Sequence, residues 1–184
     1  MRAFNPVRTT AMPERIKWTE RRFDFNFPKG IYPEMIERLR GTPARLEDRL
    51  SELSADVLTL QHEGRWSMQE NAGHLLDLES LVKQRIDEYQ AQSGVLHAAD
   101  MSNRKTYEAS HNQVPIASIL NSFRMERSAN VARLDGMEAE SFGRVALHPR
   151  LNVQMRLVDM LFFQAEHDDY HLARISELKR LLAR

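Results

Sequence analysis

Four stretches of the chain repeat apolar side chains at helical spacing, and this pattern constrains the fold more than any other feature. They cover about residues 33–53, 67–90, 115–136 and 153–183. Each stretch carries its apolar side chains along one stripe, which is typical of a helix packed against a core on one side. Four such helices predict an all-α fold, a four-helix bundle.

Local signals indicate where these helices begin. Ser67 is followed three residues later by Glu70, which is a capping box, so the second helix should start at Ser67. Thr42 precedes Pro43 and can act as an N-cap, so the first helix should kink or restart there. Asn152 can cap the fourth helix in the same way.

The connections between the predicted helices are unequal in length. Residues 91–114 form too long a segment for a simple turn between helices, so we expect this segment to cross over the bundle. A second connection, before the last helix, carries His148 and Pro149. The predicted bundle therefore has long crossover connections and a nonstandard path of the chain.

Residues 1–30 differ from the rest of the chain. They contain prolines and a short alternation of phenylalanines at Phe23, Phe25 and Phe27. The alternation has the period of a strand but is too short to form a sheet alone. We interpret residues 1–30 as an extended N-terminal arm whose phenylalanines pack on a domain of residues 31–184, with disorder at the first residues as the alternative.

Composition limits the classes of function. The chain has 184 residues, of which 42% are hydrophobic and 28% charged, as expected for one globular domain. Its 26 basic and 26 acidic residues leave no net field to attract nucleic acid. The absence of cysteine excludes disulfides, zinc–thiolate sites and cysteine nucleophiles. With no signal peptide and no membrane-spanning run, we expect a cytoplasmic protein with no membrane partner.

Histidines in the last helix provide the main chemical signal. His167 and His171 are four residues apart, so their imidazoles project from one side of a helix toward a common point. That spacing suits a metal ion, and a catalytic metal site usually adds a third protein ligand. His74 is the natural third ligand because it lies on an inward-looking helical face. The remaining histidines fall in connections: His62, His97, His111 and His148.

Two other metal sites do not fit the sequence. A di-iron bundle needs a Glu-x-x-His pair on each of two helices, which this chain lacks. The zinc-protease pattern needs a glutamate after the first histidine, where this chain has Asp168. A mononuclear site is favoured over both, and hydrogen-bonded core histidines are the alternative to any metal site.

Further polar residues share the faces of the predicted ligands. Arg174 lies on the face of His167 and His171, where it can anchor an anionic substrate group or pair with Asp77 or Glu70. Gln164 lies one turn before His167. It can hold an imidazole or a metal-bound water, or it can be a buried amide.

Carboxylates near the predicted ligands have alternative roles. Glu70, one turn before His74, can act as a supporting carboxylate or general base, although its capping role already explains it. Asp168 and Asp169 can accept imidazole protons or form a solvated charge pair. His148 and its proline can form the rim of a site or only shape their loop.

Two segments resemble the motifs of a known family. Residues 66–79 (WSMQENAGHLLDLE) and residues 165–175 (AEHDDYHLARI) resemble the second-helix and fourth-helix motifs of the DinB-like (DinB/YfiT) superfamily. The resemblance covers about residues 27–184. It implies an antiparallel four-helix bundle of unusual connectivity, often dimeric, with a divalent metal on three histidines. Here these are His74, His167 and His171.

The resemblance also implies kinds of activity. Characterised relatives include thiol-cofactor-dependent enzymes, the mycothiol-dependent maleylpyruvate isomerases and the bacillithiol transferases. Three neutral imidazoles leave a metal its full charge and open positions, so it can activate water or a thiol. Such a donor set accepts Zn, Ni, Fe, Co or Mn. We therefore expect a hydrolase or a transferase that uses a low-molecular-weight thiol.

This enzyme would act on a small-molecule substrate, and we expect a homodimer. The alternative is a metal-binding or stress-response bundle without catalysis, which works through dimerisation or a partner. The family's name also suggests DNA repair, but the neutral charge argues against contact with DNA.

Overall fold

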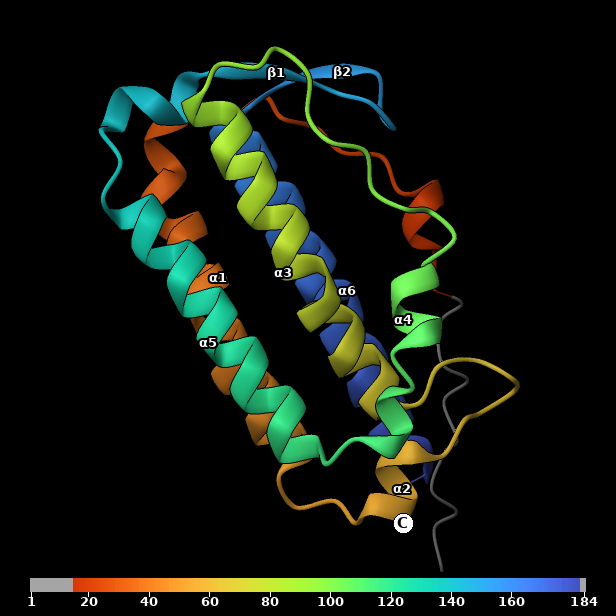
Figure 1. Ribbon diagram of the computed structural model, residues 1–184. Coiled ribbons are helices and arrows are strands. Elements are labelled where there is room, and N and C mark those ends of the chain that lie inside the picture. The colour runs from red at the N-terminus through yellow and green to blue at the C-terminus, as the bar shows by residue number, and fades with distance from the viewer. Residues whose placement is uncertain (1–14, 183–184) are drawn as a thin grey trace, which may run out of the picture.

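The computed structural model describes residues 15–182, and the first part of the predicted arm and Ala183 lie outside the described residues. Four long helices make up most of the fold and form the predicted bundle (Figure 1). They are α1 (Tyr32–Leu50), α3 (Met68–Gln90), α5 (Ile116–Asp135) and α6 (Leu157–Leu182). The shorter elements are η1 (Trp18–Glu20), η2 (Lys29–Ile31), α2 (Ala55–Thr59), α4 (Arg104–Glu108), η3 (His111–Gln113), η4 (Ala139–Gly143), β1 (Val145–His148) and β2 (Val153–Arg156).

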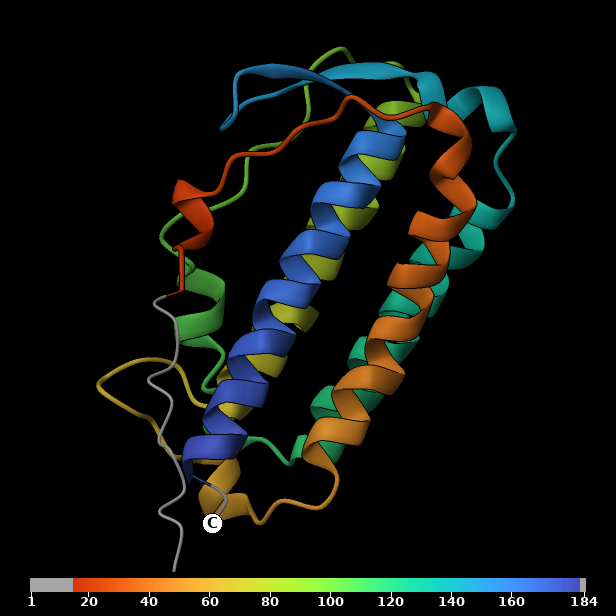
Figure 2. The same ribbon diagram turned by 180° about the vertical axis from the view of Figure 1, so that it is seen from behind.

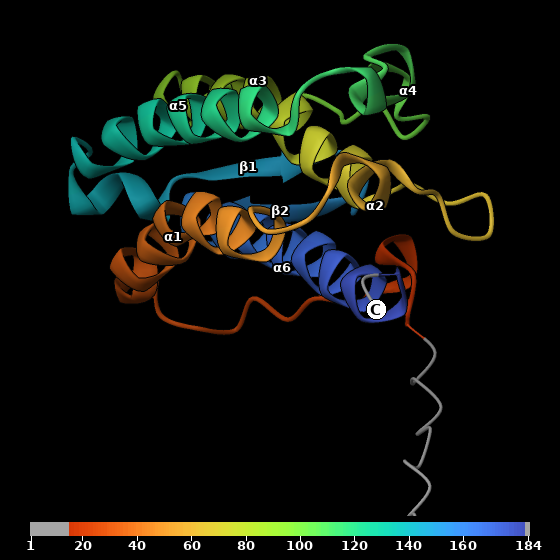
Figure 3. The same cartoon turned by 90° about the horizontal axis from the view of Figure 1, so that it is seen from below.

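The bundle has two layers, with α1 and α6 in one and α3 and α5 in the other (Figure 3). Helices within a layer run in the same direction, and the two layers run in opposite directions (Figures 1 and 2). The antiparallel arrangement implied by the resemblance therefore holds only between layers. Because α3 and α5 are parallel neighbours, the chain must return along the bundle between them. This return is the predicted crossover, and it carries α4 and η3.

The capping box forms as predicted. The Ser67 side chain accepts the backbone N–H of Glu70 at 3.0 Å, and the Glu70 carboxylate accepts the backbone N–H of Ser67 at 2.7 Å. These two bonds satisfy donors that the start of a helix would otherwise leave free. Helix α3 therefore begins directly after Ser67, a short distance along the chain before His74.

The prediction for the start of the last helix was wrong. β1 and β2 form an antiparallel hairpin, and α6 begins only at Leu157. Asn152 lies in the hairpin turn with φ of 53°, a left-handed conformation that asparagine tolerates, so it is not a helix cap. The first turn of α6 instead uses Asp159, whose carboxylate accepts the backbone N–H of Arg156 at 2.7 Å.

Helix α1 continues through Pro43, so of the two predicted outcomes at Thr42, a kink or a restart, the restart was wrong. A proline inside a helix leaves the carbonyl four residues earlier without its usual donor. Here that carbonyl belongs to Leu39, and it accepts a hydrogen bond from Arg127 Nη1 at 3.2 Å. Thr42 is fully buried, and its hydroxyl bonds to Asp168 at 2.9 Å instead of capping a helix.

A buried polar layer centred on Arg127 joins all four long helices. Its guanidinium donates to Glu79 Oε1 from Nε and Nη2 at 3.0 and 2.7 Å, and to Asp168 Oδ2 from Nη1 at 2.5 Å. Asn130 donates to the second oxygen of Glu79 at 2.9 Å. The apolar core is divided into two clusters, one near the hairpin and one near α2. Members of both clusters come from all four long helices.

The described part of the arm packs along α6, as the phenylalanine alternation predicts. Phe23 contacts Phe163 with ring centroids 4.9 Å apart, and Phe27 contacts Phe162 at 5.3 Å. Phe25 also packs against Phe162. Within the described residues, no helix combines the length and apolar content that crossing a membrane requires.

Replacing Arg127 by methionine should lower the free energy of unfolding by about 3–5 kcal/mol, because Glu79 and Asp168 would stay buried without a counter-charge. Arg133→Met is the matched control on the same helix, since Arg133 pairs with Asp87 at the surface and should cost less than about 1 kcal/mol. Urea unfolding followed by circular dichroism measures both. An Arg127 variant as stable as the control would contradict the role given to this layer.

Candidate metal centre

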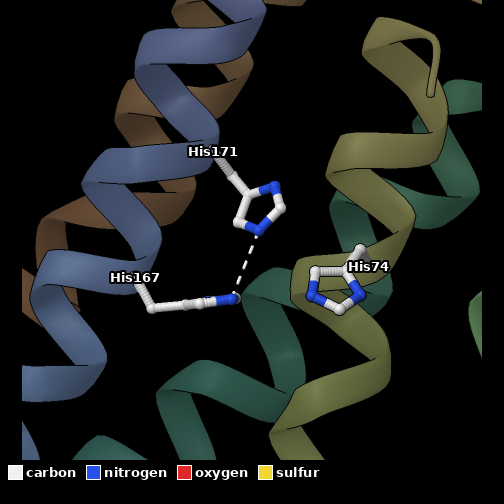
Figure 4. A group of neighbouring side chains, drawn as sticks. All are labelled: His74, His167 and His171. Carbon is white, nitrogen blue, oxygen red and sulfur yellow. Dashed lines mark hydrogen bonds between the residues drawn. The ribbon is translucent and has the colours of Figure 1, made fainter. Parts of the chain in front are cut away.

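The three predicted histidines come together between α3 and α6. The ring nitrogens that His74, His167 and His171 turn toward one another all lie within 4.8 Å. Figure 4 shows two of these rings projecting from successive turns of α6 toward the third ring on α3. The Nε2 atoms of His167 and His171 are 3.3 Å apart. A tetrahedral metal with metal–nitrogen bonds of about 2.1 Å holds its ligand nitrogens about 3.4 Å apart, so this pair fits one ion.

The hydrogen bonds around His171 fix which of its nitrogens can bind a metal. Asn71 Nδ2 donates to the carbonyl of Ser67 at 2.7 Å, so its Oδ1 must be the atom that faces the imidazole. Oδ1 lies 2.9 Å from His171 Nδ1 and can only accept, so Nδ1 carries the proton. The lone pair of His171 is therefore on Nε2, the nitrogen that faces the other two histidines.

A second chain of hydrogen bonds fixes His74. The Thr106 hydroxyl donates to Asp77 Oδ2 at 2.9 Å, so it accepts from His74 Nδ1, also at 2.9 Å. His74 therefore carries its proton on Nδ1 and leaves Nε2 free. Asp77 is held in turn by His111 Nε2 at 2.8 Å. The crossover thus supplies two of the groups that orient a histidine of α3.

Gly73 makes room for this support. A Cβ atom at Gly73 would lie 2.2 Å from Cγ of the His111 ring, a distance that real contacts do not reach. Any larger residue would push His111 away from Asp77. The glycine beside the first predicted ligand is therefore required by the close approach of the crossover to α3.

Aromatic rings surround the three histidines. The Trp18 ring meets the His167 ring edge-on at 4.9 Å, and the Trp66 ring lies 4.8 Å from the His74 ring. Burial lowers the pKa of His74 to about 4 and holds the pKa values of His167 and His171 well below their usual range. The three imidazoles are therefore neutral at pH 7, the form in which histidine binds metals.

A cleft of about 250 Å³ reaches His74 from the side of the crossover. His74 lies in its wall together with Leu78 and Leu81 of α3. The opposite wall includes Asp100, Asn103 and Lys105. The cleft gives a small molecule access to His74, and its walls carry charges of both signs.

Two predicted site residues have other partners. Gln164 is buried and donates to Asp168 Oδ1 at 3.1 Å, so it is the buried amide of the two alternatives and does not bond an imidazole. Arg174 pairs with Glu177, one turn later, at 2.8 Å. The predicted ion pair of Arg174 with Asp77 or Glu70 was therefore wrong. Asp77 and Glu70 are each hydrogen-bonded to other groups.

The predicted carboxylates have structural partners rather than imidazoles. Glu70 completes the capping box and accepts from Gln61 at 2.9 Å. Asp168 is completely buried in the polar layer, which neither alternative anticipated. Asp169 is half-buried and pairs with Arg38 and Arg45 at 2.5 and 2.6 Å.

His148 is buried at the end of β1, with its ring 5.2 Å from that of Phe163. It therefore lies inside the protein rather than on an exposed rim.

Several residues that contact or orient the three histidines were not predicted from the sequence. Asn71 was readable, because it lies three residues before His74 on the same side of α3. Thr106 and His111 lie in the crossover, where no periodicity indicates which side chain returns to the core. Trp18 belongs to the arm, which the resemblance does not cover.

Acid should destabilise the metal-free protein. The folded state holds the pKa values of His74 and His148 at about 4, whereas unfolded histidines bind protons below about pH 6.5. The free energy of unfolding should therefore fall as the pH drops from about 6.5 toward 4, by at most about 1.4 kcal/mol per pH unit for each histidine. Urea unfolding at pH 7.5, 6 and 5 measures the slope. A flat profile would contradict the burial of neutral imidazoles.

Comparison with solved structures identifies proteins of the same fold. One solved structure with the same fold is YfiT from Bacillus subtilis, described as a probable metal-dependent hydrolase with an unusual four-helix bundle topology. It has a TM-score of 0.74 at 18% identity, over 89% of this chain and 94% of that one. The mycothiol-dependent maleylpyruvate isomerase matches with a TM-score of 0.64 at 10% identity, over 82% of this chain and 61% of the isomerase.

The sequence comparisons point to one family. No curated protein matches the chain. A family model does match it, over residues 38–175, and these residues include all three histidines of the triad and the Arg127 layer. The chain therefore belongs to the DinB superfamily.

Proposed function

We propose that this protein is a divalent-metal-dependent enzyme whose metal is held by Nε2 of His74, His167 and His171. One observation carries the proposal: two of the three imidazoles are fixed with the proton on Nδ1, so their lone pairs face a common point. A merely structural cluster would not need this orientation. Three neutral nitrogen donors suit Zn, Ni, Fe, Co or Mn.

The proposed reaction is hydrolysis or the transfer of a thiol. A divalent metal on three imidazoles lowers the pKa of a bound water or thiol and leaves positions open for it. The chain has no cysteine, so the thiol would come from a low-molecular-weight cofactor. YfiT is described as a probable metal-dependent hydrolase and the isomerase as mycothiol-dependent, which supports both forms of the proposal.

The protein's own residues prepare the site for this chemistry. Asn71 and Thr106 hold the imidazole protons away from the centre. Trp18 and Trp66 cover two of the rings and exclude bulk water, which strengthens electrostatic interactions inside. The cleft beside His74 has room for a small-molecule substrate. The proposal retains the expected homodimer and cytoplasmic location.

Metal binding should depend on the triad. Titration of metal-free protein with Zn²⁺ in a calorimeter should give one tight site per chain, and His74→Ala or His171→Ala should weaken it by at least about 100-fold, because each removes one of three ligands. His62→Ala is the control, since His62 lies in a connection between α2 and α3. Equal zinc affinity in wild type and triad variants would overturn the proposed ligands.

An open coordination position separates the enzyme from a non-catalytic metal-binding bundle. Protein loaded with Co²⁺ should change its visible absorption when a small thiol is added, because the thiol replaces a bound water. The same titration on the His62→Ala variant should give the same change. A spectrum that no added thiol or anion alters would indicate a closed site and favour the non-catalytic alternative.

A further inference from the structure

Three side chains with unused hydrogen-bond donors gather at the hairpin end of α6. They are Arg85 of α3, His148 at the end of β1 and Arg150 in the hairpin turn. The Phe163 ring lies 5.2 Å from the His148 ring and 5.4 Å from the Arg150 guanidinium. One turn away on α6, the Met160 sulfur lies 3.7 Å from Arg85 Nη1. We call Arg85, His148 and Arg150 the cationic cluster.

The cationic cluster adjoins the metal centre. Phe163 lies one helical turn before His167 on α6, and the Trp18 ring contacts both, at 5.0 and 4.9 Å. Arg85 donates to the backbone carbonyl of His97 from Nε and Nη2 at 3.1 and 2.9 Å. His97 lines the cleft that reaches His74. The cluster therefore lies between the hairpin and the triad, and Arg85 contacts the backbone of a residue in the cleft wall.

Both arginines lack a carboxylate partner within residues 15–182. Arg85 is only 4% exposed, and in the described part of the chain its Nη1 has no better acceptor than the Met160 sulfur. Arg150 Nη2 is buried and has no hydrogen-bond partner among the described residues. Arg127, the other deeply buried arginine, is held by two carboxylates. Burying a guanidinium without a counter-charge is costly, so the contrast requires an explanation.

His148 adds a third donor. It is 1% exposed, and its Nδ1 accepts the backbone N–H of Leu151 at 3.3 Å. Burial and the two arginines lower the pKa of His148 to about 4, so the ring is neutral at pH 7 and carries its single proton on Nε2. Nε2 is buried and has no partner in the described chain. Every unused polar group of the cluster is therefore a donor.

We propose that the cationic cluster binds the oxyanion group, a carboxylate or a phosphate, of the substrate that reacts at the triad. This inference rests on the proposed function and adds a substrate class to it, a small anionic molecule. Two guanidinium groups and an imidazole N–H match the acceptor oxygens of such a group. The burial of Arg85 and His148 suits a small ligand rather than a polyanion on the surface.

Anion binding can be tested without any metal. Metal-free protein is titrated with inorganic phosphate and with malonate at constant ionic strength, and the melting temperature and tryptophan fluorescence are followed. At least one anion should stabilise the wild type, and the stronger of the two identifies phosphate or carboxylate as the group recognised. Arg85→Met and Arg150→Met should weaken binding by at least about tenfold. Arg144→Met is the control, because among the residues that the structure describes Arg144 donates only to backbone carbonyls of α3.

The same variants separate a binding role from a structural one. In buffer without phosphate or malonate, Arg85→Met should melt at a higher temperature than the wild type, because an uncompensated buried charge is removed. A purely structural arginine would give a lower melting temperature. The inference is overturned if neither anion stabilises the wild type, or if all variants respond to the anions as the wild type does. A failure of zinc binding would not affect these measurements.

A second measurement connects the cluster to the triad. Co²⁺-loaded protein is titrated with thiols that carry a terminal carboxylate, from mercaptoacetate to 6-mercaptohexanoate, and with alcohol analogues of equal length. At one length the carboxylate form should bind at least about tenfold more tightly than its analogue, and Arg150→Met should remove the preference while Arg144→Met retains it. No preference at any length would contradict a single substrate that spans both sites.

Discussion

The buried guanidinium of Arg127 is the interaction on which the rest of the structure depends. It binds Glu79 of α3 and Asp168 of α6, and its contact with the Leu39 carbonyl adds α1. Asp168 directly follows His167 in the sequence. When Asp168 is held in the core, the rotation of α6 about its axis is set, and His167 and His171 face α3. Helix α6 therefore contributes to both the buried polar layer and the three-histidine cluster.

Hydrogen bonds around the triad show how a buried polar site is kept in one state. Asn71 and Thr106 each leave an imidazole with a single possible proton position. Some of the side chains that orient or contact the histidines lie outside the four long helices. Thr106 and His111 belong to the crossover, and Trp18 belongs to the arm. Such a site loses rotational freedom on folding rather than on binding, which favours tight binding of a ligand.

Helix positions and the triad were predictable because their signals are local. A capping box marks the start of α3, and a four-residue spacing brings His167 and His171 together. The hairpin was missed because two strands of four residues, inside a connection, have no distinct periodicity. His74 was predicted from its inward-looking face on the second helix, and the family motifs implied the same residue.

Long-range pairings could not be predicted in the same way. Glu79 and Arg127 lie on amphipathic helices, where a charged residue normally faces water, so nothing local indicates that they are buried together. Arg174 shares a helical face with the triad, yet its nearer neighbour Glu177 binds it. The partners of Arg85 depend on where the crossover returns to α3. These contacts follow from the tertiary fold rather than from spacing.

We propose that three Nε2 atoms hold one divalent ion, and X-ray absorption spectroscopy of the zinc-loaded protein tests this most directly. We expect three imidazole nitrogens at about 2.0–2.1 Å from the zinc, together with at least one oxygen ligand. A shell of oxygen atoms alone, or an unchanged spectrum when His74 is replaced by alanine, would contradict it.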